Sequence, residues 1–255
     1  MIHPTAIVHP EAKLGANCVV GPYCIIGEHV ELGEDCKLHA HVVIDGHTKI
    51  GKSNEVYPFA CLGLKTQDLK WVGGVTRVEI GDHNTFREGV TVHAATEDGG
   101  VTRIGSNNNL LANAHVAHDC TVGDNVIMSN IATLAGHVTV EDGAIIGGLT
   151  AVHQFCRVGR LAMVGGCSRV LQDIPPFMLA EGSPAAPRTI NKIGLERNGI
   201  SEEAQVALRQ AYKILHRAGL TISNALERIE KEIPALPEVQ HFVSFVRASE
   251  RGVAR

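Results

Sequence analysis

The chain has few aromatic residues, so large rings cannot fill most of its core. Aromatic residues make up 4% of the 255 residues and include one Trp, whereas hydrophobic residues of all kinds make up 44%. The sequence also lacks an apolar run of about 18 residues, the length that a membrane-spanning helix needs. Its first residues, MIHPTAIVHP, lack the basic segment and apolar stretch of a signal peptide. We therefore expect small aliphatic side chains to form the interior, with no membrane span and no export signal.

Charge and cysteine patterns exclude further classes of protein. The formal net charge is −4, which argues against nucleic acid as a bulk partner. The seven cysteines include no C-x-x-C pair and their number is odd, so we expect buried, reduced thiols in a cytoplasmic protein. The chain also lacks a P-loop, a G-x-S-x-G motif and a dinucleotide-binding G-x-G-x-x-G motif. These absences predict chemistry without a cofactor, a metal or a covalent enzyme intermediate.

A period of six residues, a hexad, dominates the first two thirds of the chain. Every sixth residue from Ile2 to Val170 is apolar, except at Asp68, Gly74 and Asp98. This period matches neither the 3.6 of an α-helix nor the 2 of a β-strand. It is typical of a coil of three short strands, with three hexads to a turn, in which the first residue of each hexad points inward. The sequence therefore predicts an all-β solenoid, a left-handed parallel β-helix of hexapeptide repeats.

Two features of the repeat predict how its coils turn and where loops leave it. A Gly often follows the inward residue, and we expect these glycines to form tight corners. Segments 63–77 and 94–102 lose the apolar pattern, whereas the phase resumes after each. We expect both segments to project as loops. The second is short and acidic at its tip, and is more simply interpreted as surface decoration.

The repeat ends after Val170, and a different periodicity begins near residue 191. Pro and Gly residues over 173–184 are expected not to continue strands. Ser201 is a predicted N-cap, and helices are also predicted over 222–233 and 237–249. The predicted apolar face of the helix after Ser201 consists of Val206, Leu208, Ala211, Tyr212 and Leu215. We predict a β-helix over 1–190 and a helical domain over 191–255 that caps the solenoid, binds ligand, or does both.

The densest group of ionisable residues in the repeat is NAHVAHDC at 113–120. Steps of one turn, or three hexads, from His118 and Asp119 predict one edge of the coil that carries His118, Asp119, Gly136, His137, His153 and Gln154. His118 is a candidate general base, and Asp119 can fix its tautomer and offset its positive charge. The backbone N–H of Gly136 can donate to a developing oxyanion. The pattern predicts base-assisted transfer to an incoming hydroxyl or amine.

A metal site is the alternative chemistry for the same histidines. Hexapeptide helices of the γ-class carbonic anhydrases hold zinc with three histidines, and His115, His118 and His137 are the corresponding candidates. The close pair is spaced differently here, and Asp119 is better explained as the partner of a base. We therefore predict no metal.

A series of motifs in order along the chain is similar to one enzyme family. They are HVVIDGHTKIG (41–51), TQDLK (66–70), RVEIGDHN (77–84), NAHVAHDCTVG (113–123), LAGHVTV (134–140), AVHQFC (151–156), MVGGCS (163–168), QDIPP (172–176), AYKILHRAG (211–219) and the closing ERGVAR. The chain resembles the UDP-N-acetylglucosamine O-acyltransferases, which catalyse the first step of lipid A synthesis in Gram-negative bacteria. The resemblance implies a homotrimer with active sites between subunits. It also implies transfer of a 3-hydroxyacyl group from acyl carrier protein to the 3-OH of UDP-N-acetylglucosamine.

The resemblance also implies roles for individual residues. His118 is the general base, Asp119 orients it, and Gly136 stabilises the oxyanion. The implied substrate-binding residues are Gln67, Asp68, Lys70, His115, His137, His153 and Gln154, with Asn191 and Arg197 on the nucleotide side. Gly166 matches the position that limits acyl-chain length, and we expect it roughly 13 Å along the axis from His118. Glycine there predicts a long chain such as 3-hydroxymyristoyl.

Departures from the family pattern keep alternatives open. The usual His-Arg-Gly-Thr is His93-Ala94-Ala95-Thr96 here, and Ile193 replaces an expected Glu. These changes leave open a 3-amino sugar nucleotide as acceptor, which would yield an amide. A non-catalytic hexapeptide scaffold is a further alternative. The related N-acyltransferase that acts two steps later carries a uridine-binding domain before its β-helix, and here the repeat already begins at Ile2.

A basic surface for the acidic carrier protein is predicted in the helical domain. The candidate residues are Arg197, Lys213 and Arg217. A solvated helix face explains these charges equally well.

Overall fold

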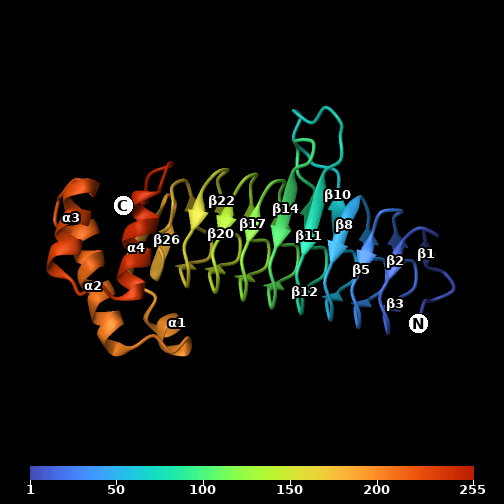
Figure 1. The fold of residues 1–255 in the computed structure, drawn as a ribbon, viewed down its shortest axis with the longest axis horizontal. Helices are drawn as coiled ribbons and strands as arrows, with labels where there is room; N and C mark the ends of the chain where they lie inside the picture. The colour runs from blue at the N-terminus through green and yellow to red at the C-terminus, as the bar shows by residue number, and fades with distance from the viewer.

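The computed structural model describes residues 1–255, which form a left-handed parallel β-helix followed by four α-helices (Figure 1). Short strands from successive coils pair into three sheets of nine, eight and ten strands. Strands in neighbouring regular coils pair three hexads apart, as Thr121 does with Thr139. The predicted fold class and the coil of three hexads are confirmed.

Each sheet is built by strands that pair in the following order. The first sheet contains β1 (Ile7–Val8), β4 (Ile25–Ile26), β7 (Val43–Ile44), β10 (Cys61–Leu64), β13 (Thr91–His93), β16 (His115–Val116), β19 (Thr133–Leu134), β22 (Ala151–Val152) and β25 (Arg169–Val170). The second contains β2 (Lys13–Leu14), β5 (Glu31–Leu32), β8 (His47–Ile50), β11 (Arg77–Ile80), β14 (Val101–Ile104), β17 (Thr121–Val122), β20 (Thr139–Val140) and β23 (Arg157–Val158). The third contains β27 (Ala185–Ile190), β26 (Met178–Gly182), β24 (Met163–Val164), β21 (Ile145–Ile146), β18 (Ile127–Met128), β15 (Asn109–Leu110), β12 (Thr85–Phe86), β9 (Glu55–Val56), β6 (Lys37–Leu38) and β3 (Val19–Val20).

The inward residues of the hexads stack into one core that runs the length of the β-helix. Ile44, Leu62, Val116 and Leu134 are fully buried in it. The chain turns most corners through a left-handed backbone conformation at the third residue after the inward one, as at Asp119, where φ is 60°. Because the aliphatic core is small in cross-section, three short flat strands per turn are enough to enclose it.

The glycines that follow inward residues have a different role from the one expected. Gly15, Gly33 and Gly51 do not adopt positive φ. A Cβ atom on any of them would lie within 3 Å of the backbone of the next coil. These glycines therefore permit close stacking between coils, and the turns are made by the residues two positions later.

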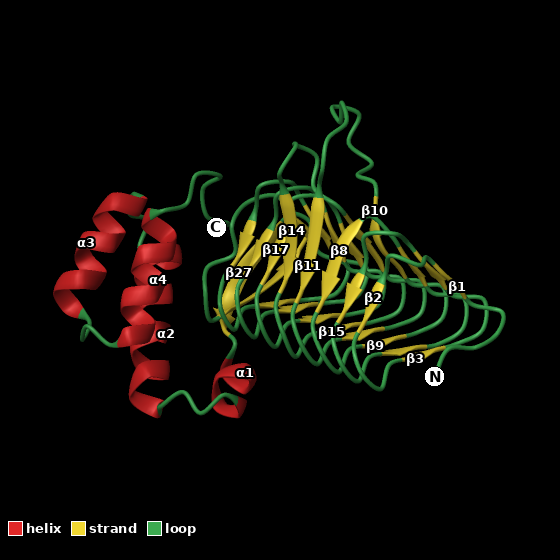
Figure 2. Cartoon of the chain, turned by 45° about the vertical axis from the view of Figure 1, so that its right-hand side comes forward, coloured by secondary structure: helices red, strands yellow, loops and turns green.

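Both predicted loops leave the β-helix where the chain passes from the first sheet to the second, which we call the loop edge (Figures 1 and 2). β11 pairs Arg77 with His47, five hexads back, and β14 pairs Val101 with Arg77, four hexads back. Because a regular coil contains three hexads, the first loop adds two hexads and the second adds one. Both insertions are whole numbers of hexads, which explains why the apolar phase resumes.

The strands continue beyond the predicted end of the repeat. β26 pairs parallel with β24, and β27 pairs antiparallel with β26. The expectation that Pro and Gly over 173–184 prevent further strands is therefore wrong. Pro175 and Pro176 precede β26, and Ser183 and Pro184 make the turn of a hairpin that extends the third sheet.

Four helices follow the hairpin: α1 (Lys192–Arg197), α2 (Glu202–Arg217), α3 (Ile222–Glu232) and α4 (Pro237–Arg247). Ser201 caps α2 as predicted, because its side chain accepts a hydrogen bond from the Ala204 N–H. The short helix α1 was not predicted. Within α2, Leu208 and Leu215 are buried, but Val206 is 46% exposed and does not belong to the apolar face. None of the four helices combines the length and apolar character needed to cross a membrane.

The last residues return to the end of the β-helix (Figure 2). Val253 forms a parallel bridge with Asp173, and the Ser249 hydroxyl donates to the buried Asp173 carboxylate at 2.7 Å. The same carboxylate accepts from the Arg157 N–H at 2.8 Å. A single buried acid thus joins the helical segment to the last coils.

Most of the cysteines lie in the core. Cys18, Cys24, Cys36, Cys120 and Cys156 are buried. Cys61 is only half-buried and Cys167 is exposed, so the expectation of burial is wrong for these two. All seven are free thiols.

Candidate active site

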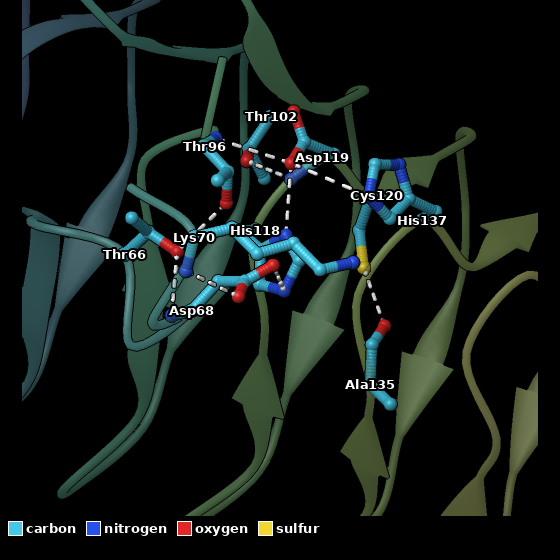
Figure 3. Close-up of polar contacts among 10 residues, drawn as sticks. All are labelled: Thr66, Asp68, Lys70, Thr96, Thr102, His118, Asp119, Cys120, Ala135 and His137. Carbon is cyan, nitrogen blue, oxygen red and sulfur yellow. Dashed lines mark hydrogen bonds and ion pairs between the residues drawn. The ribbon is translucent and has the colours of Figure 1, made fainter. Parts of the chain in front are cut away.

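His118 and Asp119 occupy neighbouring positions at one corner of the loop edge and form a hydrogen-bonded pair (Figure 3). His118 Nδ1 lies 2.8 Å from Asp119 Oδ2. Because a carboxylate only accepts hydrogen bonds, Nδ1 carries a proton, and in the neutral form of the ring Nε2 has the lone pair. Both side chains are largely shielded from solvent. The pair is therefore arranged as an imidazole base with an acidic partner.

Two threonines hold Asp119 in place. The Thr96 N–H donates to Asp119 Oδ2 at 3.1 Å, and the Asp119 N–H donates to Thr102 Oγ1 at 2.8 Å. Asp119 has φ of 60°, a conformation that Asp tolerates better than most residues. The corner backbone and both threonines therefore fix the carboxylate toward the imidazole.

Gly136 lies one coil beyond His118, directly beneath its ring. A Cβ atom on Gly136 would lie 2.3 Å from His118 Cε1 and 2.4 Å from Nε2. Only glycine lets the imidazole occupy this position. The Gly136 N–H donates to no acceptor within the chain, whereas its carbonyl accepts from the Phe155 N–H. An amide without a protein partner next to Nε2 is available to stabilise an oxyanion.

The longer loop, residues 65–76, brings Asp68 and Lys70 to the same corner (Figure 3). Asp68 Oδ2 lies 3.8 Å from His118 Nε2, on the opposite side of the ring from Asp119. Asp68 Oδ1 accepts from the Lys70 N–H at 2.9 Å, which tightens the loop. Lys70 is exposed, and its side chain crosses the His118 ring in the view of Figure 3. Gln67, in the same loop, is also exposed.

A buried contact between two threonines joins the two loops. Thr66 Oγ1 and Thr96 Oγ1 are 3.0 Å apart, and the Asp68 N–H donates to Thr66 Oγ1 at 3.0 Å. The interpretation of 94–102 as surface decoration is wrong for its first half, because Ala94, Ala95 and Thr96 are buried. Thr66, Thr96 and Thr102 were not identified from the sequence. Of the three, only Thr102 could have been located from the repeat, because it is a polar residue two positions before the inward Ile104.

His137 stands one coil beyond Asp119 in the same column of corner residues. Its Nε2 lies 3.7 Å from Asp119 Oδ2, and its ring stacks on Phe155, the next residue in the column, with 4.7 Å between centroids. Donor atoms of His118, Asp119 and His137 all lie within 4.8 Å of one another. His115 is not part of this group, so the trio considered for zinc from the sequence is not brought together. In the group that does form, Asp119 Oδ2 already accepts from His118 and Thr96.

His115 lies beside the corner, on the outer face of the first sheet. Its Nδ1 is 2.7 Å from Thr91 Oγ1, and its ring meets that of His93 edge-on at 5.0 Å. Burial, and to a smaller extent the charges of His93 and His118, lowers the pKa of His115 to about 4. His115 is therefore neutral near pH 7 and supports the wall of the site.

His153 and Gln154 lie two coils beyond His118 on the loop edge, about 10 Å along the axis at the usual strand spacing. Both are exposed. His153 Nδ1 lies 3.3 Å from an Arg251 guanidinium nitrogen. The loop edge thus presents a continuous polar strip over three coils, as the spacing of three hexads predicted.

Comparisons with known proteins identify the family of the chain. Residues 173–254 match the family model of UDP N-acetylglucosamine O-acyltransferase, domain 2, and residues 11–46 match the bacterial transferase hexapeptide model. The structure of LpxA from Acinetobacter baumannii is 44% identical, with a TM-score of 0.97 over 100% of this chain and 99% of that chain. The chain belongs to the UDP-N-acetylglucosamine O-acyltransferase family.

Other structures of this O-acyltransferase family are similarly close. LpxA, a UDP-N-acetylglucosamine acyltransferase from Bacteroides fragilis, is 42% identical, with a TM-score of 0.97 and 100% coverage of both chains. A UDP-N-acetylglucosamine O-acyltransferase from Moraxella catarrhalis is also 42% identical, with a TM-score of 0.95 over 100% of this chain and 99% of that chain.

Three residues matched to the O-acyltransferase family lie away from His118 within the chain. Gly166 follows β24 at the corner between the third and first sheets, a different edge from that of His118. Asn191 is buried and caps α1, with its side-chain amide donating to the Leu161 carbonyl at 2.9 Å. Arg197 is exposed at the end of α1.

Proposed function

We propose that the chain transfers a 3-hydroxyacyl group from acyl carrier protein to the 3-OH of UDP-N-acetylglucosamine, the first step of lipid A biosynthesis. The observation that carries this proposal is the His118–Asp119 pair, with Nε2 free, above the unpaired amide of Gly136. A base and an oxyanion donor next to each other suit acyl transfer between a thioester and a hydroxyl. Membership of the O-acyltransferase family supports the same reaction.

In the proposed mechanism, His118 acts first as base and then as acid. Nε2 takes the proton of the sugar 3-OH while that oxygen bonds to the thioester carbonyl carbon. The carbonyl oxygen becomes an oxyanion, to which the Gly136 N–H donates. When the carbonyl re-forms, the carbon–sulfur bond breaks and the imidazolium returns its proton to the departing thiolate. The products are the 3-O-acyl sugar nucleotide and the free thiol of the carrier protein.

The position of Asp68 supports a role in binding the acceptor sugar. Its carboxylate lies 3.8 Å from the nitrogen that would accept the sugar proton. A carboxylate there can accept a hydrogen bond from a neighbouring sugar hydroxyl, and the exposed Lys70 ammonium offers a positive charge to the diphosphate. His137, Gln67 and Gln154 complete the polar strip in this proposal.

A homotrimer is part of the proposal and is supported by exposed apolar residues. They lie on the outer face of the first sheet and at the corner between the third and first sheets. We call this corner the ladder edge. These residues are Ile7, Tyr23, Ile25, Phe59, Ile131 and Leu149. Large exposed apolar surfaces mark contacts with other chains. The loop edge of one subunit would then face the ladder edge of the next, with Gly166 near the acyl chain and Asn191 and Arg197 near the nucleotide.

The donor and the location are the remaining parts of the proposal. Lys213, Arg217 and Arg197 are exposed cations of the helical segment and provide a surface for an acidic carrier protein. Glycine at 166 leaves room beside the Gly148 backbone for a long chain, such as 3-hydroxymyristoyl. Seven free thiols suit the reducing cytoplasm.

Product analysis tests the function directly. The purified protein is incubated with carrier proteins bearing 3-hydroxyacyl chains of several lengths and with UDP-N-acetylglucosamine, and products are identified by mass spectrometry. We expect a UDP-3-O-acyl product. If a product forms only with the 3-amino sugar nucleotide, the reaction yields an amide instead of an ester. No product with either acceptor would refute acyl transfer and favour a non-catalytic scaffold.

A further inference from the structure

Arg251, in the segment after α4, reaches the loop edge from the opposite end of the sequence. One of its guanidinium nitrogens lies 3.3 Å from His153 Nδ1. The backbone on both sides of Arg251 is fixed. Ser249 donates to the buried Asp173 carboxylate, and the Gly252 carbonyl accepts from the Asp173 N–H at 2.9 Å. The closing segment therefore holds an exposed arginine at the far end of the polar strip, next to His153 and Gln154.

Arg251 forms no ion pair within the chain, although burial raises the pKa of the Asp173 carboxyl and the charge of Arg251 offsets part of that rise. The arginines that form ion pairs are Arg87, Arg103, Arg157, Arg188, Arg228 and Arg247. The buried Asp173 carboxylate, which contacts this segment, accepts hydrogen bonds from the Arg157 N–H and the Ser249 hydroxyl instead. Arg251 thus combines a fixed backbone, an unpaired positive charge and a place on the strip that also carries His118.

We propose that Arg251 is a phosphate-binding residue of the active site. This inference rests on the proposed function, because both proposed substrates carry phosphate away from their reacting atoms. A guanidinium matches a phosphate with two parallel N–H donors, and a neighbouring imidazole can add a third donor. The phosphate belongs either to the phosphodiester of the donor's pantetheine arm or to the diphosphate of the sugar nucleotide. Two coils of separation from His118 place Arg251 beyond the reacting atoms in either case.

The test compares Arg251→Gln and Arg251→Lys with the unaltered protein. Arg247→Gln is the matched control, because Arg247 is exposed nearby but pairs with Glu230 at 2.9 Å. KM is measured for UDP-N-acetylglucosamine, for the acyl carrier protein, and for an acyl-pantetheine donor that has no phosphate. For Arg251→Gln we expect about a tenfold rise in one KM with kcat nearly unchanged, since a hydrogen bond to a charged group is worth about that factor. For Arg251→Lys, which keeps the positive charge but loses the two parallel N–H donors, we expect an intermediate rise in KM.

The pattern of changes identifies the source of the phosphate. A rise for the carrier protein with none for acyl-pantetheine assigns the donor arm, and a rise for UDP-N-acetylglucosamine alone assigns the diphosphate. Unchanged KM values for all three substrates would overturn the proposal, and so would equal rises for the two donors. If Arg251→Gln lowers Tm, Arg251→Lys decides in its place.

A binding measurement separates this inference from the proposed reaction. Inorganic pyrophosphate is titrated by calorimetry into the unaltered protein, Arg251→Gln and Arg247→Gln. We expect binding that weakens about tenfold only in Arg251→Gln. This result would support the anion site even if the protein transferred no acyl group. Equal affinity in all three proteins would refute it even if the protein were an active acyltransferase.

Discussion

The loop edge and the ladder edge of the β-helix have the same backbone and different chemistry. At the loop edge, Asp119 and His137 have φ of 60°, and at the ladder edge Ile131 and Leu149 have φ of 63° and 58°. Both edges repeat every coil. The loop edge carries two insertions and a polar strip, whereas the ladder edge is uninterrupted and carries stacked rings and aliphatic side chains, as where His41 stacks on Phe59.

This difference shows that the coil determines the spacing of the residues, whereas the residues placed on each edge determine its chemistry. A left-handed conformation is strained for a branched residue such as Ile131, which is nevertheless 48% exposed. Strain retained at an exposed apolar residue suggests a role outside the chain, and the proposed homotrimer would place this edge against another subunit. At the loop edge the same conformation is occupied by Asp119, which suits it, and the residue serves within the chain.

Replacing His118 by Ala removes the proposed base from the loop edge, and we expect this change to have the largest effect. We expect kcat to fall by about 10²- to 10⁴-fold, the usual contribution of a general base, while Tm stays near that of the unaltered protein. His83→Asn is the control. His83 is an exposed corner residue with φ of 57° at the remaining edge, and Asn tolerates that conformation. Full activity in His118→Ala, measured by product formation, would exclude the proposed base.

Replacing Thr96 by Val tests whether the two loops of the loop edge act together. Valine keeps the shape but leaves the buried Thr66 hydroxyl without its partner, which is 3.0 Å away. We expect KM for the sugar nucleotide to rise about tenfold, because Asp68 is held through Thr66, with a smaller effect on kcat. Thr96→Ser should restore normal kinetics. If Thr66→Val and Thr96→Val add without coupling in the double variant, the threonines do not act as a pair.

Much of the fold was predictable because its inward residues repeat without regard to the loops. The step of three hexads from His118 located Gly136 correctly, since the geometry of stacked strands is the same in every coil. Contacts made through inserted residues were not predictable. Thr66 and Thr96 lie in segments with no period, and nothing in the spacing relates them. The hairpin of β26 and β27 was missed because prolines at its turn and entry resemble a simple end of structure.

Replacing Gly166 by Met extends the comparison to the ladder edge. A Cβ atom at this position would lie 3.2 Å from the Gly148 carbonyl oxygen and 3.8 Å from the Gly148 nitrogen, so the backbone can remain in place with a small adjustment. We expect the ratio of kcat/KM for long over short 3-hydroxyacyl donors to fall about tenfold, with activity on short donors retained. Competition between donors of different length measures this ratio. An unchanged ratio would show that the ladder edge does not limit the acyl chain.

For His115, on the sheet that joins the two edges, we expect a smaller effect, on the free energy of unfolding. Its pKa is lowered from 6.5 to about 4, chiefly by burial, so the unfolded chain binds this proton more tightly than the folded one. The stabilisation is therefore complete above about pH 6.5 and is lost as the pH falls toward 4. Because the side chain is only half-buried, we expect a loss of about 1 kcal/mol from this residue. Urea unfolding at pH 7 and pH 4.5 measures it by comparison with His115→Asn. An equal pH dependence in both proteins would show that other groups, such as the buried His93, dominate the acid sensitivity of this face.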